Sequence, residues 1–362
     1  MKIKPSLRKK AGLTVFRHYR KAQAELHELS YLFWECTLRC NISCLHCGSD
    51  CRKESSISDM PANDFLQVTK ELTHYYNPNK VMVVLTGGEP LMRKDLEYVG
   101  QELKKQGYPW GFVTNGVALT SQRFRSLMNA GLRSVTVSLD GFEDTHEWLR
   151  GHKGGFNKAV EAIRLIVRES DLVYDVATCI SRKNFHQLND LKEFLIELGV
   201  KKWRIFTIFP TGRAKGNDEL DVSPEQMLGL MNFLKETREE GRIRASYGCE
   251  GYLGNFETEV RDGYYFCRAG VMIASVLADG SISACPNIHR GFVQGNIYQD
   301  KFIDVWNNRF ENFRNRDWAK TGKCMNCEAF RYCEGNSMHL REPGNENPLR
   351  CHYEMMKQCG HS

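Results

Sequence analysis

Three closely spaced cysteines limit what this chain can be more than any other feature. Within WECTLRCNISCLHCGSDC, residues 34–51, Cys40, Cys44 and Cys47 follow a C-x3-C-x2-C spacing. Three thiolates cannot complete the four-thiolate shell of a [4Fe–4S] cluster, so one iron would stay open to another molecule. Zinc is the alternative metal, because Cys36 or Cys51 could supply the fourth thiolate that it normally requires.

The chain is rich in cysteine but shows no export signal, so we expect a reducing compartment. The chain has 362 residues and 14 cysteines, and its first 20 residues contain no apolar core or cleavage site of a secretory signal. No apolar run approaches the roughly 20 residues that a membrane span needs. We therefore expect a cytoplasmic protein whose clustered thiols bind metal rather than form disulfides.

Strand-like and helix-like segments alternate through the first two thirds of the chain. The β-rich runs are residues 31–36, 80–88, 109–116, 133–141, 172–181 and 201–210. Their near-continuous apolar character is typical of parallel strands covered by helices on the outside. The expected fold class is α/β, a partial (β/α)6 barrel followed by a small cysteine-rich α+β domain.

We expect three units along the chain: a basic N-terminal extension at 1–29, the barrel at 30–240 and the cysteine-rich domain at 241–362. Much of the formal net charge of +6 lies in the first 20 residues. A solvated, partly disordered leader is the expectation for that stretch, without nucleic-acid or membrane contact. Its helix-like end, residues 17–26, would either dock a substrate's leader peptide or stay solvated.

Chemically distinctive residues follow the predicted strands, where barrels of this kind gather their chemistry. The three cysteines follow the first strand, Gly87-Gly88-Glu89-Pro90 the second and Asn115 the third, while Ser138 ends the fourth. This combination of cysteine spacing and Gly-Gly-Glu-Pro segment resembles the radical S-adenosylmethionine (SAM) superfamily over about residues 30–215.

The resemblance implies a [4Fe–4S] cluster on Cys40, Cys44 and Cys47, whose open iron chelates SAM. Reductive cleavage of SAM would then give methionine and a 5'-deoxyadenosyl radical. The implied SAM-binding residues are His46, Gly87, Gly88, Glu89, Asn115, Ser138 and Arg150. Glycine lets the backbone approach the SAM amino group, and Glu89 would accept its hydrogen bond. The alternatives are a turn-capping Asn115, a surface Arg150 and a plain loop histidine at His46.

The C-terminal cysteines resemble the SPASM extension, an auxiliary-cluster domain of radical SAM enzymes that modify peptides and proteins. The matching features are Cys267, Gly280 and Cys285, followed by the C-x2-C-x5-C spacing that starts at Cys324. The implied ligands are Cys249, Cys267 and Cys285 for the first auxiliary cluster, and Cys324, Cys327, Cys333 and Cys351 for the second. Zinc on the last four is the alternative. The expected non-ligands are Cys36, Cys51, Cys179 and Cys359.

Two departures from the SPASM pattern bear on function. Ser337 stands where the pattern has a cysteine, so the first auxiliary cluster would keep an open iron for a substrate thiolate or for His339. Pro286 stands where anaerobic sulfatase-maturing enzymes carry a catalytic aspartate, which disfavours formylglycine formation. The remaining candidate bases are Asp140, Asp279 and Glu334.

The predicted function is oxidative modification of a peptide or protein side chain by a radical SAM enzyme. The chain looks most like the subgroup that is paired with small lipoprotein-like partners. The expected partners are a peptide or small-protein substrate and a flavodoxin- or ferredoxin-type reductant. A porphyrin- or haem-precursor-modifying enzyme is one alternative. A non-catalytic iron–sulfur electron carrier is another, but the Gly-Gly-Glu-Pro segment argues against it. The substrate and the bond formed stay open.

Overall fold

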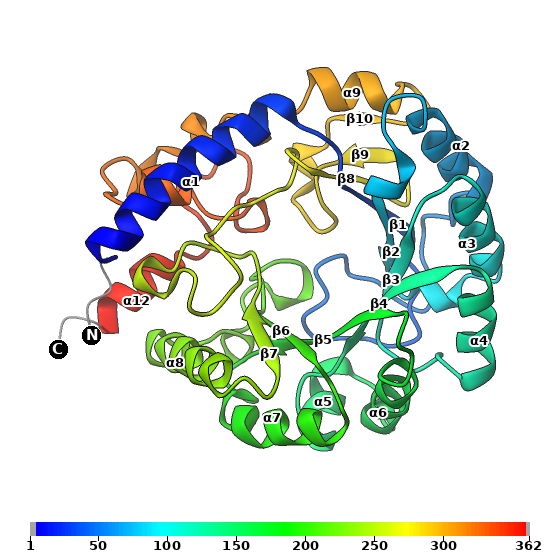
Figure 1. Cartoon of the computed structure of the whole chain (residues 1–362), viewed down its shortest axis with the longest axis horizontal. Coiled ribbons are helices and arrows are strands. Elements are labelled where there is room, and N and C mark those ends of the chain that lie inside the picture. The colour runs from blue at the N-terminus through cyan, green and yellow to red at the C-terminus, as the bar shows by residue number, and fades with distance from the viewer. Residues whose placement is uncertain (1–4, 360–362) are drawn as a thin grey trace.

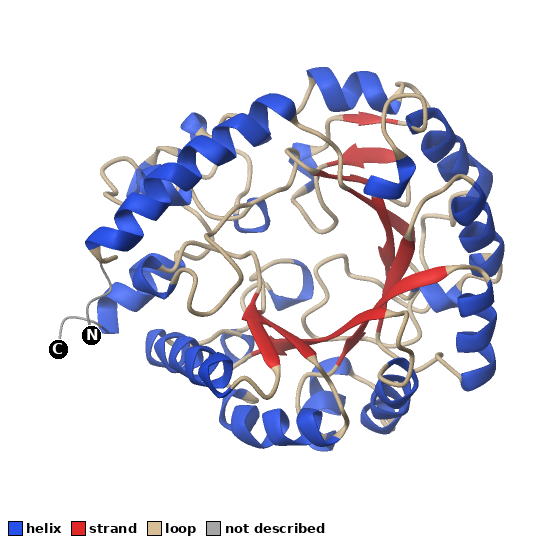
Figure 2. Ribbon diagram, in the orientation of Figure 1, coloured by secondary structure: helices blue, strands red, loops and turns tan. Residues whose placement is uncertain are grey.

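A single curved sheet organises the molecule in the computed structural model, which describes residues 5–359. Its strand order is β10-β9-β8-β1-β2-β3-β4-β5-β6-β7. The strands are β1 (Tyr31–Thr37), β2 (Met82–Gly87), β3 (Trp110–Thr114), β4 (Leu132–Ser138), β5 (Val173–Ile180), β6 (Lys202–Thr207), β7 (Arg244–Tyr247), β8 (Ile273–Val276), β9 (Ser281–Ser283) and β10 (Gly295–Asn296). All neighbours from β8 through β1 to β7 pair in parallel, and the sheet bends as an open barrel (Figure 2).

Helices cover the convex side of this sheet (Figure 1). They are α2 (Ala62–Leu72), α3 (Leu96–Lys105), α4 (Ser121–Asn129), α5 (Glu143–Arg150), α6 (Gly155–Ile166), α7 (Leu188–Glu197) and α8 (Pro224–Glu240). Each buries an apolar stripe; Phe65 of α2, for example, stacks on Trp34 of β1 with ring centroids 4.4 Å apart. The six predicted strands and the partial barrel are confirmed. The short β7 was not predicted from the sequence.

The last third of the chain continues the same sheet. Strand β8 pairs in parallel with β1, and β9 and β10 add antiparallel strands beyond it. The remaining helices, α9 (Phe302–Asn308), α10 (Glu311–Arg314), α11 (Phe330–Cys333) and α12 (His352–Cys359), are short and joined by loops. The sheet therefore crosses the proposed boundary at residue 240, and the three-unit division stays a prediction.

The expectation of a solvated, partly disordered leader is wrong for helix α1 (Leu7–Leu26). This helix lies against α11 along the outside of the C-terminal region (Figure 1). Arg20 is 4% exposed and donates to the carbonyls of Tyr332 (2.6 Å) and Arg331 (3.2 Å) and to Glu334 Oε1 (3.0 Å). These partners lie about 310 positions away, so the local charge pattern could not reveal them. Residues 1–4 lie outside the described residues.

We predict that Arg20→Met loosens α1 and lowers the free energy of unfolding by about 2–3 kcal/mol, because two buried carbonyls lose a charged donor. Limited proteolysis and thermal unfolding would measure both effects. Arg17→Met is the matched control, since Arg17 is exposed on the same helix. Equal protease resistance of the two variants would contradict this account of how α1 is held.

Within residues 5–359, none of the helices combines the length and the apolar character that crossing a lipid bilayer requires.

Candidate functional site

A cavity of about 340 Å3 opens at the carboxyl ends of β1 to β4, and we call it the main cavity. It collects nearly all of the residues predicted to bind the cluster and SAM. Those in its lining are Cys40, Cys44, Cys47, His46, Gly87, Gly88, Asn115, Ser138 and Arg150. Because parallel strands end at one edge of a sheet, residues far apart in sequence converge here.

The three motif cysteines lie in a loop that follows β1. Cys40 and Cys44 are buried, and burial raises the pKa of the Cys40 thiol to about 12. A thiolate at such a position needs a cation beside it, which cluster iron would provide. In the part of the chain that the structure describes, no three His, Cys, Asp or Glu side chains form a site for a single metal ion.

Two glycines let β2 end directly against this loop. A Cβ at Gly88 would lie 2.2 Å from the Arg39 carbonyl oxygen, and one at Gly87, whose φ is 128°, would lie 2.1 Å from that of Thr37. Only glycine tolerates such a close approach. The Gly88 and Glu89 amides donate to the same two carbonyls, at 2.8 and 3.0 Å. The Gly-Gly pair therefore positions the loop. Its approach to the SAM amino group stays a prediction.

Glu89 lies behind the wall of the main cavity and not in it. Its Oε1 accepts from Thr114 Oγ1 (2.9 Å) and the Leu91 amide (3.2 Å), and its Oε2 accepts from the Asn115 amide (2.8 Å). Burial raises the pKa of this carboxyl to about 7. The carboxylate thus ties the end of β2 to the end of β3. Its contact with the SAM ammonium stays a prediction.

Asn115 both caps a turn and reaches the cluster loop. Its Oδ1 accepts from the Val117 amide at 2.9 Å, which is the turn-capping role considered from the sequence. Its Nδ2 donates to Asn41 Oδ1 at 2.8 Å and lies 3.9 Å from Cys40 Sγ. One side chain therefore couples the end of β3 to the first cluster cysteine.

Arg150 is not a surface charge, because its side chain is only 11% exposed. Its Nε lies 2.5 Å from Asp140 Oδ2, and its Nη1 lies 3.8 Å from Cys44 Sγ. Burial alone would raise the pKa of Asp140, but the nearby Arg150 guanidinium holds it below its usual value. Asp140 also accepts from the Cys179 amide at 2.8 Å. Both oxygens are engaged, so Asp140 is a poor candidate for a catalytic base.

His46 lines the main cavity and carries a buried ring nitrogen, Nδ1, without a hydrogen-bond partner among the described residues. Burial, with Arg150 nearby, lowers the pKa of the ring to about 4, so the imidazole is neutral at pH 7. Buried polar atoms in native proteins are normally paired, and a bound ligand would supply the partner. Together with the three thiols and the glycine contacts, this nitrogen makes the cavity suited to a cluster with SAM.

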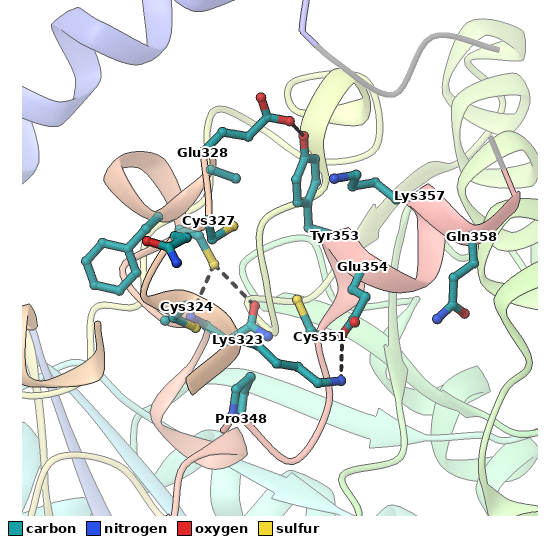
Figure 3. Close-up of a pocket in the computed structure, with 16 residues that line it drawn as sticks. Lys323, Cys324, Cys327, Glu328, Pro348, Cys351, Tyr353, Glu354, Lys357 and Gln358 are labelled. Atoms are coloured by element: carbon teal, nitrogen blue, oxygen red, sulfur yellow. Dashed lines mark hydrogen bonds and ion pairs between the residues drawn. The ribbon is translucent and has the colours of Figure 1, made fainter. Parts of the chain in front are cut away.

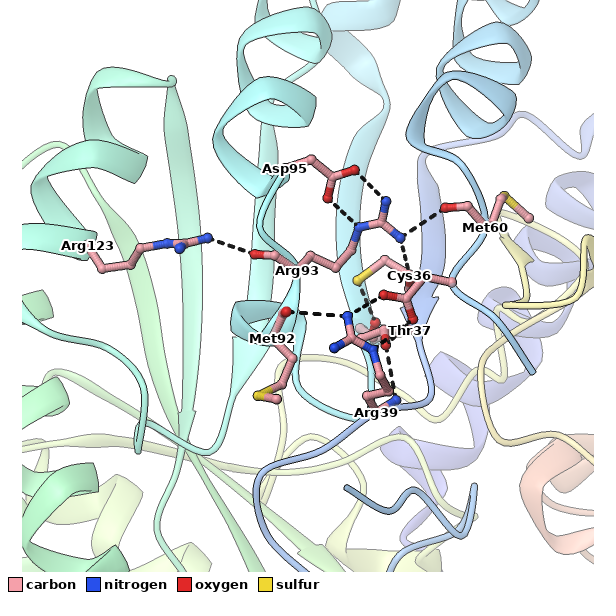
Figure 4. A network of polar contacts seen from close by, with 10 residues as sticks. Cys36, Thr37, Arg39, Met60, Met92, Arg93, Asp95 and Arg123 are labelled. Carbon is pink, nitrogen blue, oxygen red and sulfur yellow. Dashed lines mark hydrogen bonds and ion pairs between the residues drawn. The ribbon is translucent and has the colours of Figure 1, made fainter. Parts of the chain in front are cut away.

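A polar network ties the end of β1, next to the cluster loop, to neighbouring segments (Figure 4). Arg93 donates to the carbonyls of Cys36 (2.8 Å) and Met60 (3.0 Å) and pairs with Asp95. The Cys36 thiol points to the Thr86 carbonyl, 3.2 Å away, in a fully buried position. That environment agrees with the prediction that Cys36 is not a ligand.

Residues of a distant segment also hold the cluster loop, and sequence reasoning missed them. Arg213 donates to the carbonyls of Cys44 (2.7 Å) and Cys51 (2.9 Å). A Cβ at Gly212, with φ of 56°, would lie 2.4 Å from the Cys47 carbonyl oxygen. The PTGRA segment, residues 210–214, was the available signal, but its partners could not be inferred from the sequence.

The three thiols predicted to hold the first auxiliary cluster lie close enough to act on one another electrostatically. Burial raises the pKa of Cys285, and the neighbouring thiols of Cys249 and Cys267 raise it further. Cys285 also lines the main cavity. The alternative ligand His339 has its Nε2 2.9 Å from the Pro286 carbonyl oxygen, so this nitrogen is already engaged.

Ser337 is fully buried and its Oγ has no partner among the described residues. We predict that Ser337→Cys supplies a fourth thiolate and slows the loss of iron to a chelator several-fold. Iron release from the reconstituted protein and electron paramagnetic resonance (EPR) would show it. Ser275→Cys is the control, because Ser275 is equally buried and unpartnered but outside the SPASM pattern. Equal protection by both variants would refute the assignment.

The ligands predicted for the second auxiliary cluster share one cavity of about 620 Å3 (Figure 3). All four of them line it: Cys324, Cys327, Cys333 and Cys351. The Asn336 amide donates to Cys333 Sγ at 3.2 Å, and Arg341 donates to Cys324 Sγ at 3.3 Å. Donors aimed at cysteine sulfur are typical of cluster ligands, where they tune the redox potential.

Comparison with known proteins agrees with this geometry. Residues 34–195 match the radical SAM superfamily, and residues 267–328 match the SPASM iron–sulfur cluster-binding domain. An AdoMet-dependent heme synthase of Methanosarcina barkeri is 28% identical over 324 residues, covering 83% of this chain and 89% of the relative. Mycofactocin maturase MftC of Mycolicibacterium smegmatis is 28% identical over 320 residues, covering 85% and 77%.

A solved structure has a similar fold. Streptococcus suis SuiB bound to precursor peptide SuiA superposes with a TM-score of 0.70 at 16% identity, covering 93% of this chain and 79% of SuiB. At this identity the likeness concerns the fold, including the arrangement of barrel and C-terminal region.

Proposed function

Because this chain carries a radical SAM domain followed by a SPASM domain, we propose that it oxidatively modifies a peptide or protein side chain. These domains bind a [4Fe–4S] cluster with SAM and auxiliary iron–sulfur clusters. Bound SAM supplies, on reduction, a 5'-deoxyadenosyl radical that removes a hydrogen atom from a substrate. The protein's own part is to hold the reacting groups in place and to exclude water.

One observation carries the proposal. The main cavity is lined on one side by Cys40, Cys44 and Cys47 and on another by Cys285, the predicted auxiliary ligand. A substrate in this space would have a hydrogen-atom acceptor and an electron acceptor within the same chamber. That is the arrangement an oxidation needs, whereas a simple electron carrier has no use for an open chamber.

Individual residues have defined tasks in this proposal. Arg150, held by Asp140, would place its positive charge at the SAM carboxylate. His46 would pair its free Nδ1 with the ligand. Gly87 and Gly88 keep the backbone close to the cluster loop, where larger residues would push it away.

The similarity to MftC and to SuiB with its precursor peptide supports a peptide substrate. The similarity to heme synthases supports the second candidate, a porphyrin or haem precursor. The lipoprotein-like partner and the flavodoxin- or ferredoxin-type reductant stay predictions.

The test is 5'-deoxyadenosine formation by the anaerobically reconstituted protein with SAM and dithionite. Small peptides encoded beside the gene, and iron coproporphyrin III, would be added in parallel. Stimulation by a peptide together with a mass change on it would support the proposal. Stimulation by the porphyrin alone would favour the second candidate. No cleavage by a protein with intact clusters would refute both.

A further inference from the structure

Glu35, on β1, is the only carboxylate among the described residues that line the main cavity. It is 3% exposed. It also lines a second cavity of about 420 Å3, formed largely by the cluster loop and residues 287–290. The two cavities share Gly48, Ser49 and Asn287 as well. Glu35 therefore stands in the wall common to both spaces, within reach of a molecule in either.

The hydrogen bonds to Glu35 leave capacity for another donor. Oε1 accepts from Ser49 Oγ at 3.2 Å and Oε2 accepts from the Ala278 amide at 3.3 Å. Charge-assisted hydrogen bonds are normally shorter, about 2.7–2.9 Å, and each carboxylate oxygen can accept two. Arg290 is 3.9 Å away and pairs more closely, at 3.0 Å, with Asp279. The buried charge of this carboxylate is therefore stabilised only by two long hydrogen bonds and a distant arginine.

The acids suggested by the sequence are placed less well. Asp140 is locked to Arg150, and Asp279 lines neither cavity. Glu334 pairs with Arg20 beneath α1, outside both spaces. Pro286, which replaces a catalytic aspartate, lies in the main cavity and has no proton-accepting group. Glu35, and none of these candidate acids, therefore lies in the main cavity with a carboxylate that can accept a proton.

We propose that Glu35 is the catalytic residue that accepts the proton lost by the substrate in the main cavity. This inference rests on the proposed function. The substrate gives one hydrogen atom to the adenosyl carbon, forming a C–H bond of 5'-deoxyadenosine. It then gives one proton to Glu35 and one electron to a one-electron oxidant of the iron–sulfur class. The substrate has lost two electrons and two protons, so one new bond forms within it.

The electrostatics suit this task. Burial raises the pKa of Glu35, which makes it a stronger base than an exposed glutamate. The charged or titratable groups that act on it are Arg290, Asp279 and the Cys51 thiol. Glu35 lies five positions before Cys40, and none of its hydrogen-bond partners is a predicted cluster ligand.

Glu35→Gln and Glu35→Asp test the proposal with the reconstituted protein, SAM, dithionite and the stimulating gene-neighbour peptide. We expect Glu35→Gln to lower the amount of modified peptide per 5'-deoxyadenosine at least tenfold, and Glu35→Asp to retain a larger share. Product formation should rise with pH in the parent protein and lose this rise in Glu35→Gln. Glu342→Gln is the control, because Glu342 lines the second cavity but not the main cavity.

Iron, sulfide and EPR measurements distinguish a catalytic role of Glu35 from a structural one. A structural role would lower the cluster content of Glu35→Gln, whereas a catalytic role would leave it unchanged. A product ratio in Glu35→Gln equal to that of the parent would overturn the proposal. If no peptide stimulates the parent protein, the proposed function fails, and infrared pH-difference spectra then decide about Glu35. A carboxyl band that titrates above the ordinary glutamate range and is missing in Glu35→Gln would support it; a band at or below that range would overturn it.

Discussion

Replacing Cys44 with alanine is expected to abolish 5'-deoxyadenosine formation, to below about 1% of the parent rate. With only two thiolates left, the loop cannot hold a cluster that keeps a single open iron for SAM. The other cluster sites, which lie in the C-terminal region, should keep their iron. Product analysis by liquid chromatography, with iron and EPR measurements, would show the selective loss.

Cys36→Ala is the control for this experiment. Cys36 is fully buried beneath the loop and its thiol points to the Thr86 carbonyl. Its loss should cost about 1 kcal/mol of stability and leave SAM cleavage in place. Equal loss of activity in both variants would point to a fourth thiolate and would revive a zinc-type site.

The second large effect is expected from Arg150→Met. This change leaves Asp140 fully buried without its cation, and breaking a buried pair in this way costs about 3–5 kcal/mol. The double variant with Asp140→Asn should recover much of that loss, because no uncompensated charge then remains. Chemical unfolding of the four proteins in the cycle would measure the coupling.

The pH dependence gives an independent check. In the parent protein Arg150 holds the pKa of Asp140 below its usual value, so the stabilisation is present above that value and is lost on acidification. In Arg150→Met the guanidinium no longer offsets burial, which raises this pKa, so the destabilisation grows as pH rises. The stability deficit of Arg150→Met should therefore shrink as the pH falls toward about 4. A deficit that is constant with pH would exclude Asp140 as its cause.

The sequence was informative where the chemistry depends on short spacings. Cys40, Cys44 and Cys47 are close in the chain, so their spacing alone predicted one loop around one site. The parallel strands were predicted equally well, because strands buried on both faces are apolar throughout. Asn115 and Ser138 line the main cavity, as expected for residues that follow or end such strands.

Residues whose role depends on distant partners were missed or misjudged. Arg20 looked like part of a solvated basic leader, but its hydrogen-bond acceptors lie beyond residue 330. Glu35 looked like one residue of a strand, and only the fold shows that it faces two cavities. The hydrogen bonds of Glu89 to the end of β3 were also missed, while its contact with SAM stays a prediction.

The parallel pairing of β1 with β8 has a consequence for electron transfer. Strand β1 leads into the loop of Cys40, and β8 leads through β9 to Cys285. Backbone pairing at four positions, from Tyr31–Ile273 to Trp34–Val276, therefore fixes the distance between the two strands that lead to these cysteines. Because tunnelling rates fall steeply with distance, the electron transfer in the proposed function would depend on this fixed strand separation.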